Sequence, residues 1–133
     1  MSRTNWRDGG GFEEAAAYSR AVRIDSHVAV SGTAPMDDGV VLHRGDAYAQ
    51  TSTAIAKALA AAAELGARRE DVIRTRLLLA AGTDWEAAVR AHREAFAGID
   101  PANTSYYVAG FIPDGVLVEV ELDAIVPDPE PPR

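Results

Sequence analysis

Three acidic residues alternate with apolar residues near the C-terminus. Glu119, Glu121 and Asp123 each follow an aliphatic residue, and alternation with a period of two is typical of a β-strand whose successive side chains point to opposite faces. The three carboxyl groups are therefore expected on one face, about 6.6 Å apart along the strand. A carboxyl group on this face, such as that of Glu119, could position water or move a proton, and would do so better with its pKa raised by nearby acids or partial burial.

An ion pair is the alternative role for Glu119. Arg74 and Arg76 occupy alternate positions in the apolar segment 71–80 and are expected on the same sheet face as the acids. Exposed cross-strand pairs of opposite charge contribute about 0.2–1 kcal/mol each. From the residues alone, Glu119 serves either as a catalytic group or as a partner of one arginine, whereas Glu121 and Asp123 are expected to be structural.

Several other kinds of chemistry are excluded or disfavoured. The chain has no cysteine, which excludes disulfides, thiol nucleophiles and thiolate metal sites. Its three histidines, His27, His43 and His92, lack metal-ligand spacing, so no metal is predicted. Ser31 has no recognisable histidine or acid relay, which argues against a nucleophilic serine.

Length and composition limit the domain count and the partners. The 133 residues predict one domain over residues 1–126 and a proline-rich tail over 127–133. A net charge of −7 argues against nucleic acid as a partner, because phosphate binding depends on Lys and Arg. No apolar run approaches the roughly 20 residues that span a bilayer, and the N-terminus lacks a signal-peptide pattern. We therefore expect a cytoplasmic protein with no membrane partner.

The first half of the chain predicts a hairpin followed by a helix. Alternating apolar residues over 22–34, with a turn at Asp25-Ser26, favour two strands. Asp46 is the expected N-cap of a helix that reaches about Leu65, with Gly66 just beyond its end.

The second half predicts a strand, a helix and two further strands. Residues 71–80 favour a strand, and Thr83 is the expected first residue of a capping box for a helix that ends at Gly98. The apolar stripe expected on that helix is Trp85, Ala88, Val89, His92 and Phe96. Residues 104–112 and 116–126 are predicted to pair antiparallel around Pro113-Asp114-Gly115.

These elements predict an α+β fold with two helices on one face of a single mixed β-sheet. The residues expected beneath the helices are Val28, Val30, Ile73, Leu77, Val118 and Val120. The uncovered face then receives Ser31, Arg74, Arg76, Glu119, Glu121 and Asp123. Such a face is either solvated or buried between copies of the chain, and spacing alone leaves both open.

Several segments, taken in order, are shared with a known family. They are Tyr18-Ser19-x-Ala21-Val22, Val30-Ser31-Gly32-x-x-Pro35, Gln50, Gly66-Ala67 before Asp71-Val72-Ile73, Pro101-Ala102, and Leu117-Val118-Glu119-Val120-Glu121-x-x-Ala124. Over roughly residues 18–126 the chain resembles the Rid family, also called YjgF-like proteins. The resemblance implies a chorismate-mutase-like fold and a homotrimer with a central β-barrel, with three ligand clefts between adjacent subunits.

The resemblance also implies an activity and a site. Active members deaminate reactive enamine and imine intermediates, and this chemistry needs no cofactor. In them, the first Glu of the Val-Glu-Val-Glu motif helps to place the water, and an arginine directly after Pro-Ala binds the substrate carboxylate. Carried onto this sequence, the catalytic residue is Glu119, and the substrate-binding residues are Tyr18, Ser31, Gly32, Asn103 and Thr104.

This chain departs from the pattern at the arginine, because Asn103 follows Pro101-Ala102. A neutral amide replaces a permanently charged fork, a loss of roughly 1.5–3 kcal/mol for one charge-assisted contact, or about one to two decades in affinity. One alternative is that Arg90 or Arg93 restores the charge near the cleft; the other is that both lie on the solvated helix face and pair with Glu86 or Glu94.

Two classes of function therefore stay open. The first is hydrolysis of an imine or enamine metabolite other than small 2-aminoacrylate. The second is a non-catalytic trimer that binds a small molecule or regulates a partner protein. Ribonuclease activity is also attached to the resembling family in places, but the acidic balance and the lack of a histidine pair argue against it.

Overall fold

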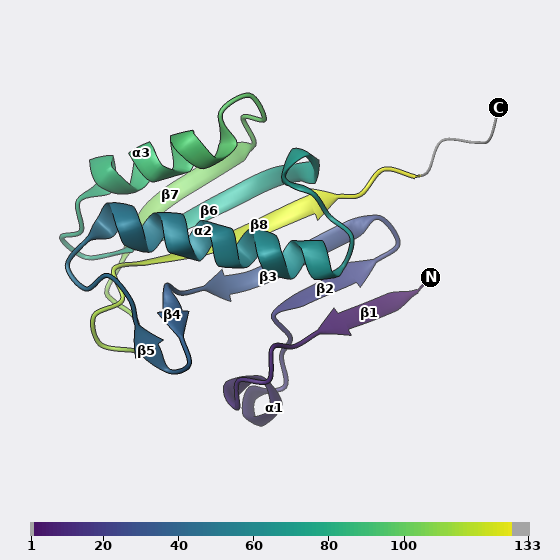
Figure 1. The fold of residues 1–133 in the computed structure, drawn as a ribbon, viewed down its shortest axis with the longest axis horizontal. Coiled ribbons are helices and arrows are strands. Elements are labelled where there is room, and N and C mark those ends of the chain that lie inside the picture. Colours follow the sequence, from purple (N-terminus) through teal and green to yellow (C-terminus); the bar gives the residue numbers. More distant parts are fainter. Residues whose placement is uncertain (1, 129–133) are drawn as a thin grey trace.

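Six strands form the main sheet, in the spatial order β1-β2-β3-β8-β6-β7. The computed structural model describes residues 2–128, and Figure 1 shows α2 and α3 packed side by side on one face of the sheet. The elements are β1 (Arg3–Trp6), α1 (Phe12–Ala16), β2 (Ala21–Ile24), β3 (His27–Thr33), β4 (Met36–Asp37), β5 (Val40–Val41), α2 (Ala47–Glu64), a 3-10 turn (Arg69–Asp71), β6 (Val72–Ala80), α3 (Trp85–Phe96), β7 (Ala102–Val108) and β8 (Val118–Ile125). The predicted α+β arrangement, with two helices on one face of a mixed sheet, is confirmed.

The hairpin and the first long helix agree with the sequence patterns. β2 and β3 pair antiparallel, and Asp25 adopts a φ of 51° in the turn between them. The Asp46 side chain accepts a hydrogen bond from the Ala49 amide at 3.0 Å, which identifies it as the N-cap of α2. Gly66 follows the end of α2 with a φ of +91°, a conformation that glycine adopts at little cost.

The last two strands do not pair with each other, so the antiparallel pair predicted around Pro113-Asp114-Gly115 is wrong. β7 ends at Val108 and runs parallel to β6, at the edge of the sheet. β8 lies between β3 and β6 and is antiparallel to both. The central position buries the apolar side of β8 completely, with Val118, Val120 and Leu122 all at 0% exposure, whereas nearly every residue of β7 is exposed. Burial of the more apolar strand therefore overrides the local turn pattern.

The core lies between the helices and the sheet. Five of the six residues predicted beneath the helices are buried, namely Val28, Val30, Leu77, Val118 and Val120. The exception is Ile73, which is 49% exposed while its neighbour Val72 is buried. The cause is a register shift between β6 and β8 at Val72 and Arg74, since a slip of one residue moves a side chain to the other face.

The second helix starts one residue later than predicted. Asp84, and not Thr83, is the N-cap of α3, and its side chain accepts hydrogen bonds from the amides of Glu86 and Ala87. The stripe prediction is also partly wrong, because Trp85 and Val89 are 53% and 41% exposed, whereas Ala88 and Phe96 are buried. The side chains of Asp and Thr can both accept hydrogen bonds from the first amides of a helix. Thr83 and Asp84 are therefore adjacent residues that could each cap this helix.

Some elements were not expected from the sequence. β1 extends the sheet beyond β2, α1 forms a short turn before Tyr18, and β4 and β5 make a separate two-stranded ribbon. The predicted tail at 127–133 lies largely outside the described residues. Within residues 2–128, no helix combines the length and the apolar character needed to cross a bilayer.

Candidate functional site

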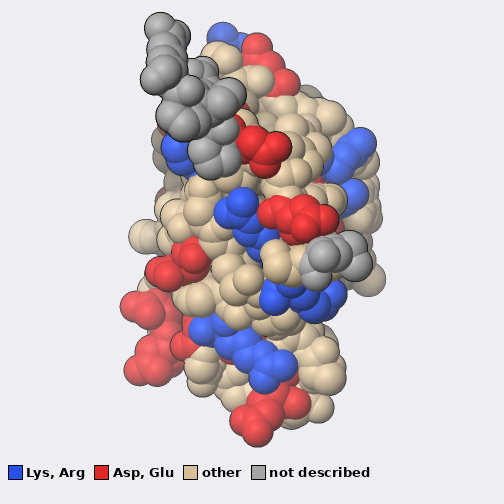
Figure 2. Space-filling view, turned by 90° about the vertical axis from the view of Figure 1, so that its right-hand side faces the viewer, with Lys and Arg blue, Asp and Glu red and all other residues tan. Residues whose placement is uncertain are grey.

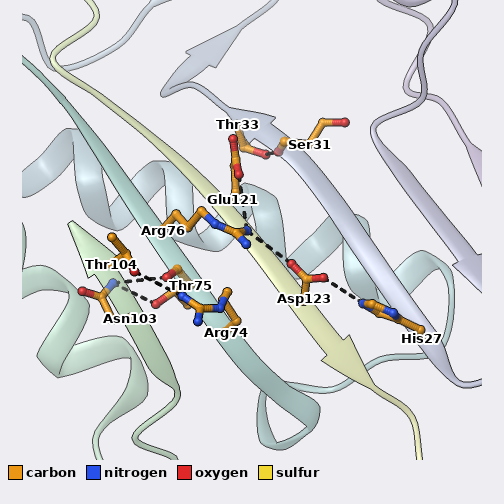
Figure 3. Close-up of polar contacts among 10 residues, drawn as sticks. All are labelled: His27, Ser31, Thr33, Arg74, Thr75, Arg76, Asn103, Thr104, Glu121 and Asp123. Atoms are coloured by element: carbon orange, nitrogen blue, oxygen red, sulfur yellow. Dashed lines mark hydrogen bonds and ion pairs between the residues drawn. The ribbon is translucent and has the colours of Figure 1, made fainter. Parts of the chain in front are cut away.

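Two of the three alternating acids on β8 are held by ion pairs on the open face of the sheet. Arg76 on β6 lies 3.5 Å from a carboxylate oxygen of both Glu121 and Asp123, and His27 Nε2 lies 2.8 Å from Asp123 Oδ2. Figure 3 shows the Arg76 guanidinium between these two acids. Glu119 has no ion pair within the described residues, so the alternative of a salt bridge to Arg74 or Arg76 is not what the structure shows.

Glu119 instead lies against the backbone of Gly32. A Cβ atom added to Gly32 would sit 2.7 Å from Glu119 Oε1, which means that the carboxyl group occupies the space that any other residue would fill. The side chain is half-buried. Burial raises the pKa of Glu119, the charge of Arg20 opposes this rise, and the charge of Glu121 adds to it. A carboxyl group in this state is suited to general acid–base chemistry closer to neutral pH.

The Ser31-Gly32 segment is an irregularity in β3. The pairing of β3 with β8 shifts between Val30 and Thr33, a β-bulge that leaves local backbone groups without ladder partners. The Ser31 hydroxyl donates to the Ser19 carbonyl at 2.7 Å. The bulge thereby brings Ser31 and Gly32, two of the predicted ligand-binding residues, to the open face beside Glu119.

Arg20 supports this bulge, and the sequence reasoning missed it. Its Nη2 donates to the Gly32 carbonyl at 2.8 Å, to Thr33 Oγ1 at 2.8 Å and to the Ser31 carbonyl at 3.4 Å. Arg20 is the unassigned position of the Tyr18-Ser19-x-Ala21-Val22 segment. A signal was present, because the next residue, Ala21, is on the helix-covered face, and strand alternation then directs residue 20 to the open face.

Tyr18 lies close to this group along the chain. Its side chain is 36% exposed, and its amide donates to the Glu13 carbonyl at 2.9 Å where α1 ends. The structure therefore gathers Arg20, Ser31, Gly32 and Glu119, with Tyr18 two residues before Arg20 in the segment that leads into β2.

Asn103 belongs to a different set of contacts. Its Nδ2 donates to Thr75 Oγ1 at 3.0 Å, and its Oδ1 accepts from the Ser105 hydroxyl at 2.8 Å. Thr75 Oγ1 is in turn 2.7 Å from His92 Nε2 on α3. We call Ser105, Asn103, Thr75 and His92 the relay. Figure 3 shows the bonds from Asn103 to Thr75.

The relay lies on the helix-covered side of the sheet. Thr75 is fully buried, and Asn103 is its register partner on β7, so the two side chains share that face. Thr104, the next residue, points to the open face, where its hydroxyl accepts from Arg74 at 3.2 Å. Asn103 and Glu119 are thus on opposite faces of the sheet and do not meet within one chain.

The buried part of the relay carries no charge. Burial lowers the pKa of His92, whose ring also packs 4.9 Å from that of Phe96. The imidazole, the Thr75 hydroxyl and the Asn103 amide are joined by hydrogen bonds, so this region forms a continuous network of neutral groups.

Arg90 and Arg93 were the two alternatives for replacing the missing arginine. Neither belongs to the group formed by Arg20, Ser31, Gly32 and Glu119. The Arg90 guanidinium stacks 4.6 Å from the centroid of the Tyr48 ring, rather than pairing with Glu86 or Glu94. Arg93 lines a hollow of about 560 Å³ together with His92, Phe96, Ala97, Gly98, Asp100 and Pro101. A second hollow of about 590 Å³ lies where α2 and α3 begin and includes Arg90. Neither hollow is lined by Glu119.

Charges of both signs are interspersed on the side of the molecule that lies on the right of Figure 1. Figure 2 shows this side, where Lys and Arg alternate with Asp and Glu in small groups. Alternation of this kind differs from the basic stripe that is typical of a nucleic-acid interface.

Comparison with known proteins gives a consistent result over most of the chain. A family model described as Endoribonuclease L-PSP matches residues 11–126. An uncharacterized protein from Streptomyces coelicolor is 41% identical over 118 residues, which cover 89% of this chain and 88% of that protein.

Solved structures resemble this fold closely. The crystal structure of a member of the highly conserved YjgF/YER057c/UK114 family from Mycobacterium tuberculosis has a TM-score of 0.84 and 38% identity, covering 94% of this chain and 100% of that one. A candidate endoribonuclease L-PSP from Entamoeba histolytica has a TM-score of 0.79 and 25% identity, covering 94% of this chain and 100% of that one.

Proposed function

The chain belongs to the YjgF (Endoribonuclease L-PSP) family, and we propose that it is a cytoplasmic homotrimer that hydrolyses an imine or enamine metabolite in clefts between subunits. The observation that carries the proposal is the environment of Glu119, a half-buried carboxyl group with a raised pKa that contacts Gly32 and is free of ion pairs among residues 2–128. A group in this state can exchange a proton with water, whereas the paired Glu121 and Asp123 are committed to Arg76.

Glu119 would act on the attacking water. In its ionised form it accepts a proton as the water oxygen bonds to the carbon of a protonated C=N group, which gives a carbinolamine. The protonated Glu119 then returns this proton to the nitrogen. The C–N bond breaks, and the ionised Glu119 carries the remaining proton from the oxygen to the departing ammonia, which gives the carbonyl product and ammonium. This sequence uses one carboxyl group as both base and acid and requires no cofactor.

A trimer would bring the two separated sets of predicted residues together. Glu119 and Asn103 lie on opposite faces of the sheet, so they can line one cleft only if they come from different copies. Light scattering at micromolar concentration tests this directly. We expect three times the mass of the chain, and a stable monomer would contradict both the trimer and the shared cleft.

The test of activity is ammonia release from imines generated in the assay by an amino-acid oxidase. Replacing Glu119 with Gln keeps the shape of the side chain and removes the base, so we expect turnover to fall by about 10²–10⁴-fold. Glu121→Gln is the matched control, because it makes the same change two residues away on the same face. Equal turnover of wild type and Glu119→Gln over a range of imines would refute the catalytic role.

A non-catalytic trimer that binds a small molecule or a partner protein is the second candidate function. It is favoured by one observation, namely that the Asn103 amide is engaged by Thr75 and Ser105 where active relatives of this type carry an arginine. Ligand binding that persists in Glu119→Gln, with no turnover in wild type, would support it. RNA cleavage by wild type that Glu119→Gln abolishes would instead favour the nuclease activity that the family description names.

A further inference from the structure

The hydrogen bonds of the relay run in one direction. Asn103 Nδ2 lies 3.0 Å from Thr75 Oγ1 and 3.4 Å from the Thr75 carbonyl oxygen. A carbonyl oxygen only accepts hydrogen bonds, so the nitrogen of the Asn103 amide, and not its oxygen, faces Thr75. Both hydrogens of Nδ2 are then directed at Thr75, and Oδ1 is turned toward the Ser105 hydroxyl, which donates to it at 2.8 Å.

This direction continues from Thr75 to His92. A threonine hydroxyl has one hydrogen to donate, and within residues 2–128 the contacts of Thr75 Oγ1 are with Asn103 and His92. Thr75 is fully buried, and a buried hydroxyl hydrogen without an acceptor is costly. The hydroxyl that accepts from Asn103 therefore donates to His92 Nε2. Burial lowers the pKa of His92, which favours the neutral ring that this arrangement needs, with its proton on Nδ1.

His92 can carry its proton on Nδ1 because that atom is not sealed in the interior. Nδ1 has no hydrogen-bond partner within the described chain. In the same range the only fully buried side-chain polar atom without a partner is Glu13 Oε1. The His92 ring lines the hollow at the end of α3, so Nδ1–H has access to solvent there.

The exposed end of the relay is left with oxygen lone pairs only. Asn103 and Ser105 are exposed on β7, the edge strand. The hydroxyl hydrogen of Ser105 goes to Asn103, and both amide hydrogens of Asn103 go to Thr75. Neither side chain has a donor left for a ligand, whereas Asn103 Oδ1 and Ser105 Oγ can each accept a further hydrogen bond.

The direction of these bonds decides which ligand group fits. A carboxylate has only acceptor oxygens, which would face other oxygens here. An ammonium group would lose water without gaining a counter-charge, because the side chains of the relay are neutral. Resting on the proposed function, in which Asn103 lines the cleft, we infer that Asn103 and Ser105 bind a neutral N–H group, and that the substrate is an imine that carries a primary amide in place of a carboxylate.

The first experiment reads the direction of the relay from the tautomer of His92. Two-bond proton–nitrogen NMR spectra distinguish the protonated ring nitrogen from the unprotonated one, and at about pH 8 a histidine of lowered pKa is neutral. We expect the proton on Nδ1. Asn103→Asp keeps the shape but has no donor, so the Thr75 hydroxyl must turn to the carboxylate and the His92 proton should move to Nε2.

Asn5→Asp is the matched control for Asn103→Asp. It adds the same charge on β1, at the opposite edge of the sheet, and should leave the His92 proton on Nδ1. A proton on Nε2 in wild type, or one that stays on Nδ1 in Asn103→Asp, would overturn the inference. The wild-type spectrum decides the question by itself should Asn103→Asp fail to fold.

The second experiment compares three four-carbon probes by isothermal titration calorimetry on the wild-type protein. Butanamide offers N–H donors without charge, butanoate offers acceptors only, and butylammonium offers donors with a positive charge. We expect butanamide to bind roughly 10-fold more tightly than butanoate. Equal affinities, or tighter binding of butanoate, would refute the inference. Tighter binding of butylammonium than of butanamide would refute the assignment to a neutral group.

The position of the bound probe can be read from Asn103 itself. The side-chain amides of the chain are those of Asn5, Gln50 and Asn103, so their NMR signals are few, and Asn103→Leu assigns one of them. Butanamide should shift the Asn103 signal and leave that of Asn5 unchanged, and Asn103→Leu should lose the preference for butanamide. A preference that persists in Asn103→Leu would place the amide elsewhere and refute the inference.

Tautomer and binding are measured without turnover, so the inference and the proposed function fail in different ways. A preference for butanamide that depends on Asn103, with no hydrolysis of any imine, would refute catalysis and leave the ligand class. Imine hydrolysis that depends on Glu119, with butanoate bound as tightly as butanamide, would refute the inference alone.

Discussion

The bulge beside Glu119 and the relay around Thr75 both contain several polar side chains. The two regions differ in how many of their polar groups have a hydrogen-bond or ion-pair partner. At the bulge, Arg20 keeps unpaired donors and Glu119 has no ion pair among residues 2–128. In the relay, Ser105, Asn103, Thr75 and His92 form a continuous set of hydrogen bonds. The first region has charge available for a ligand, and the second has none.

This contrast separates stability from function. A closed network of neutral groups in a low dielectric rigidifies the structure, whereas a partly satisfied charged group is costly unless something else uses it. The position at which the family resemblance implies the ligand anchor, Asn103, lies in the closed network. We therefore expect substitutions at the bulge to change activity and substitutions in the relay to change stability.

Gly32→Ala should have the largest effect of the variants that test this contrast. The added Cβ would be 2.7 Å from Glu119 Oε1, so the carboxyl end of a flexible side chain must move away. We expect turnover to fall by about 10²-fold or more, as for loss of a general base, with little change in the melting temperature.

Gly110→Ala is the matched control for Gly32→Ala. A Cβ at Gly110 meets nothing within 4 Å, so both activity and stability should stay as in wild type. Full activity in Gly32→Ala would show that the position of the Glu119 carboxyl is immaterial.

Thr75→Val should have the opposite profile. It removes the hydroxyl that links His92 Nε2 and Asn103 Nδ2. This leaves His92 Nε2 unpaired and leaves Asn103 Nδ2 with only its longer bond to the Thr75 carbonyl, at 3.4 Å. We expect the free energy of unfolding to fall by about 1–3 kcal/mol, measured by urea denaturation. Thr75→Ser keeps the hydroxyl and should lose less. A Thr75→Val protein as stable as wild type would show that the relay contributes nothing.

The sequence predicted the layers of this fold better than its strand partners. Alternation and caps such as Asp46 report on local structure, and they placed the helices and the buried side of β8. The exposure of Ile73 and the parallel pairing of β7 depend on register and on the competition for the centre of the sheet. These are properties of distant segments, so no local pattern contains them.

The sequence placed only some residues of the candidate site, and their roles stay predictions. Glu119, Ser31 and Gly32 were identified from a strand pattern and a family resemblance, and the structure brings them together at one bulge. Arg20 was missed because the groups that accept its hydrogen bonds lie at the β-bulge. The alternation of residues in β3 does not reveal that bulge. Asn103 was assigned as a binding residue because it follows Pro101-Ala102. That position in the sequence does not indicate that the Asn103 amide forms a hydrogen bond with Thr75.

A change of pH should affect stability in opposite directions through Glu119 at the bulge and through His92 in the relay. Burial raises the pKa of Glu119 in the folded protein, so stability is lost as pH rises above the ordinary pKa of 4.5 and through the folded value. Burial lowers the pKa of His92, so stability is lost as pH falls below 6.5 and through the folded value.

Each titration is isolated by removing its group. Glu119→Gln should be more stable than wild type near pH 7, with the difference shrinking toward about pH 4, where both side chains are neutral. His92→Gln should lose the additional acid destabilisation below pH 6.5, whatever its absolute stability. Urea midpoints across this pH range provide the measurement, and parallel curves for wild type and either variant would contradict the corresponding shift.

Asn103→Arg should have the smallest effect and tests the contrast from the other side. The arginine restores the residue type that the family resemblance implies, but it removes the donor to Thr75 and the acceptor of Ser105. Because Asn103 is at an exposed edge strand, we expect a loss of only about 0.5–1.5 kcal/mol in unfolding free energy, and Asn103→Ala should lose a similar amount. Urea denaturation provides the measurement, and an Asn103→Arg protein as stable as wild type would show that these two hydrogen bonds contribute nothing, so the division between the two regions would not hold.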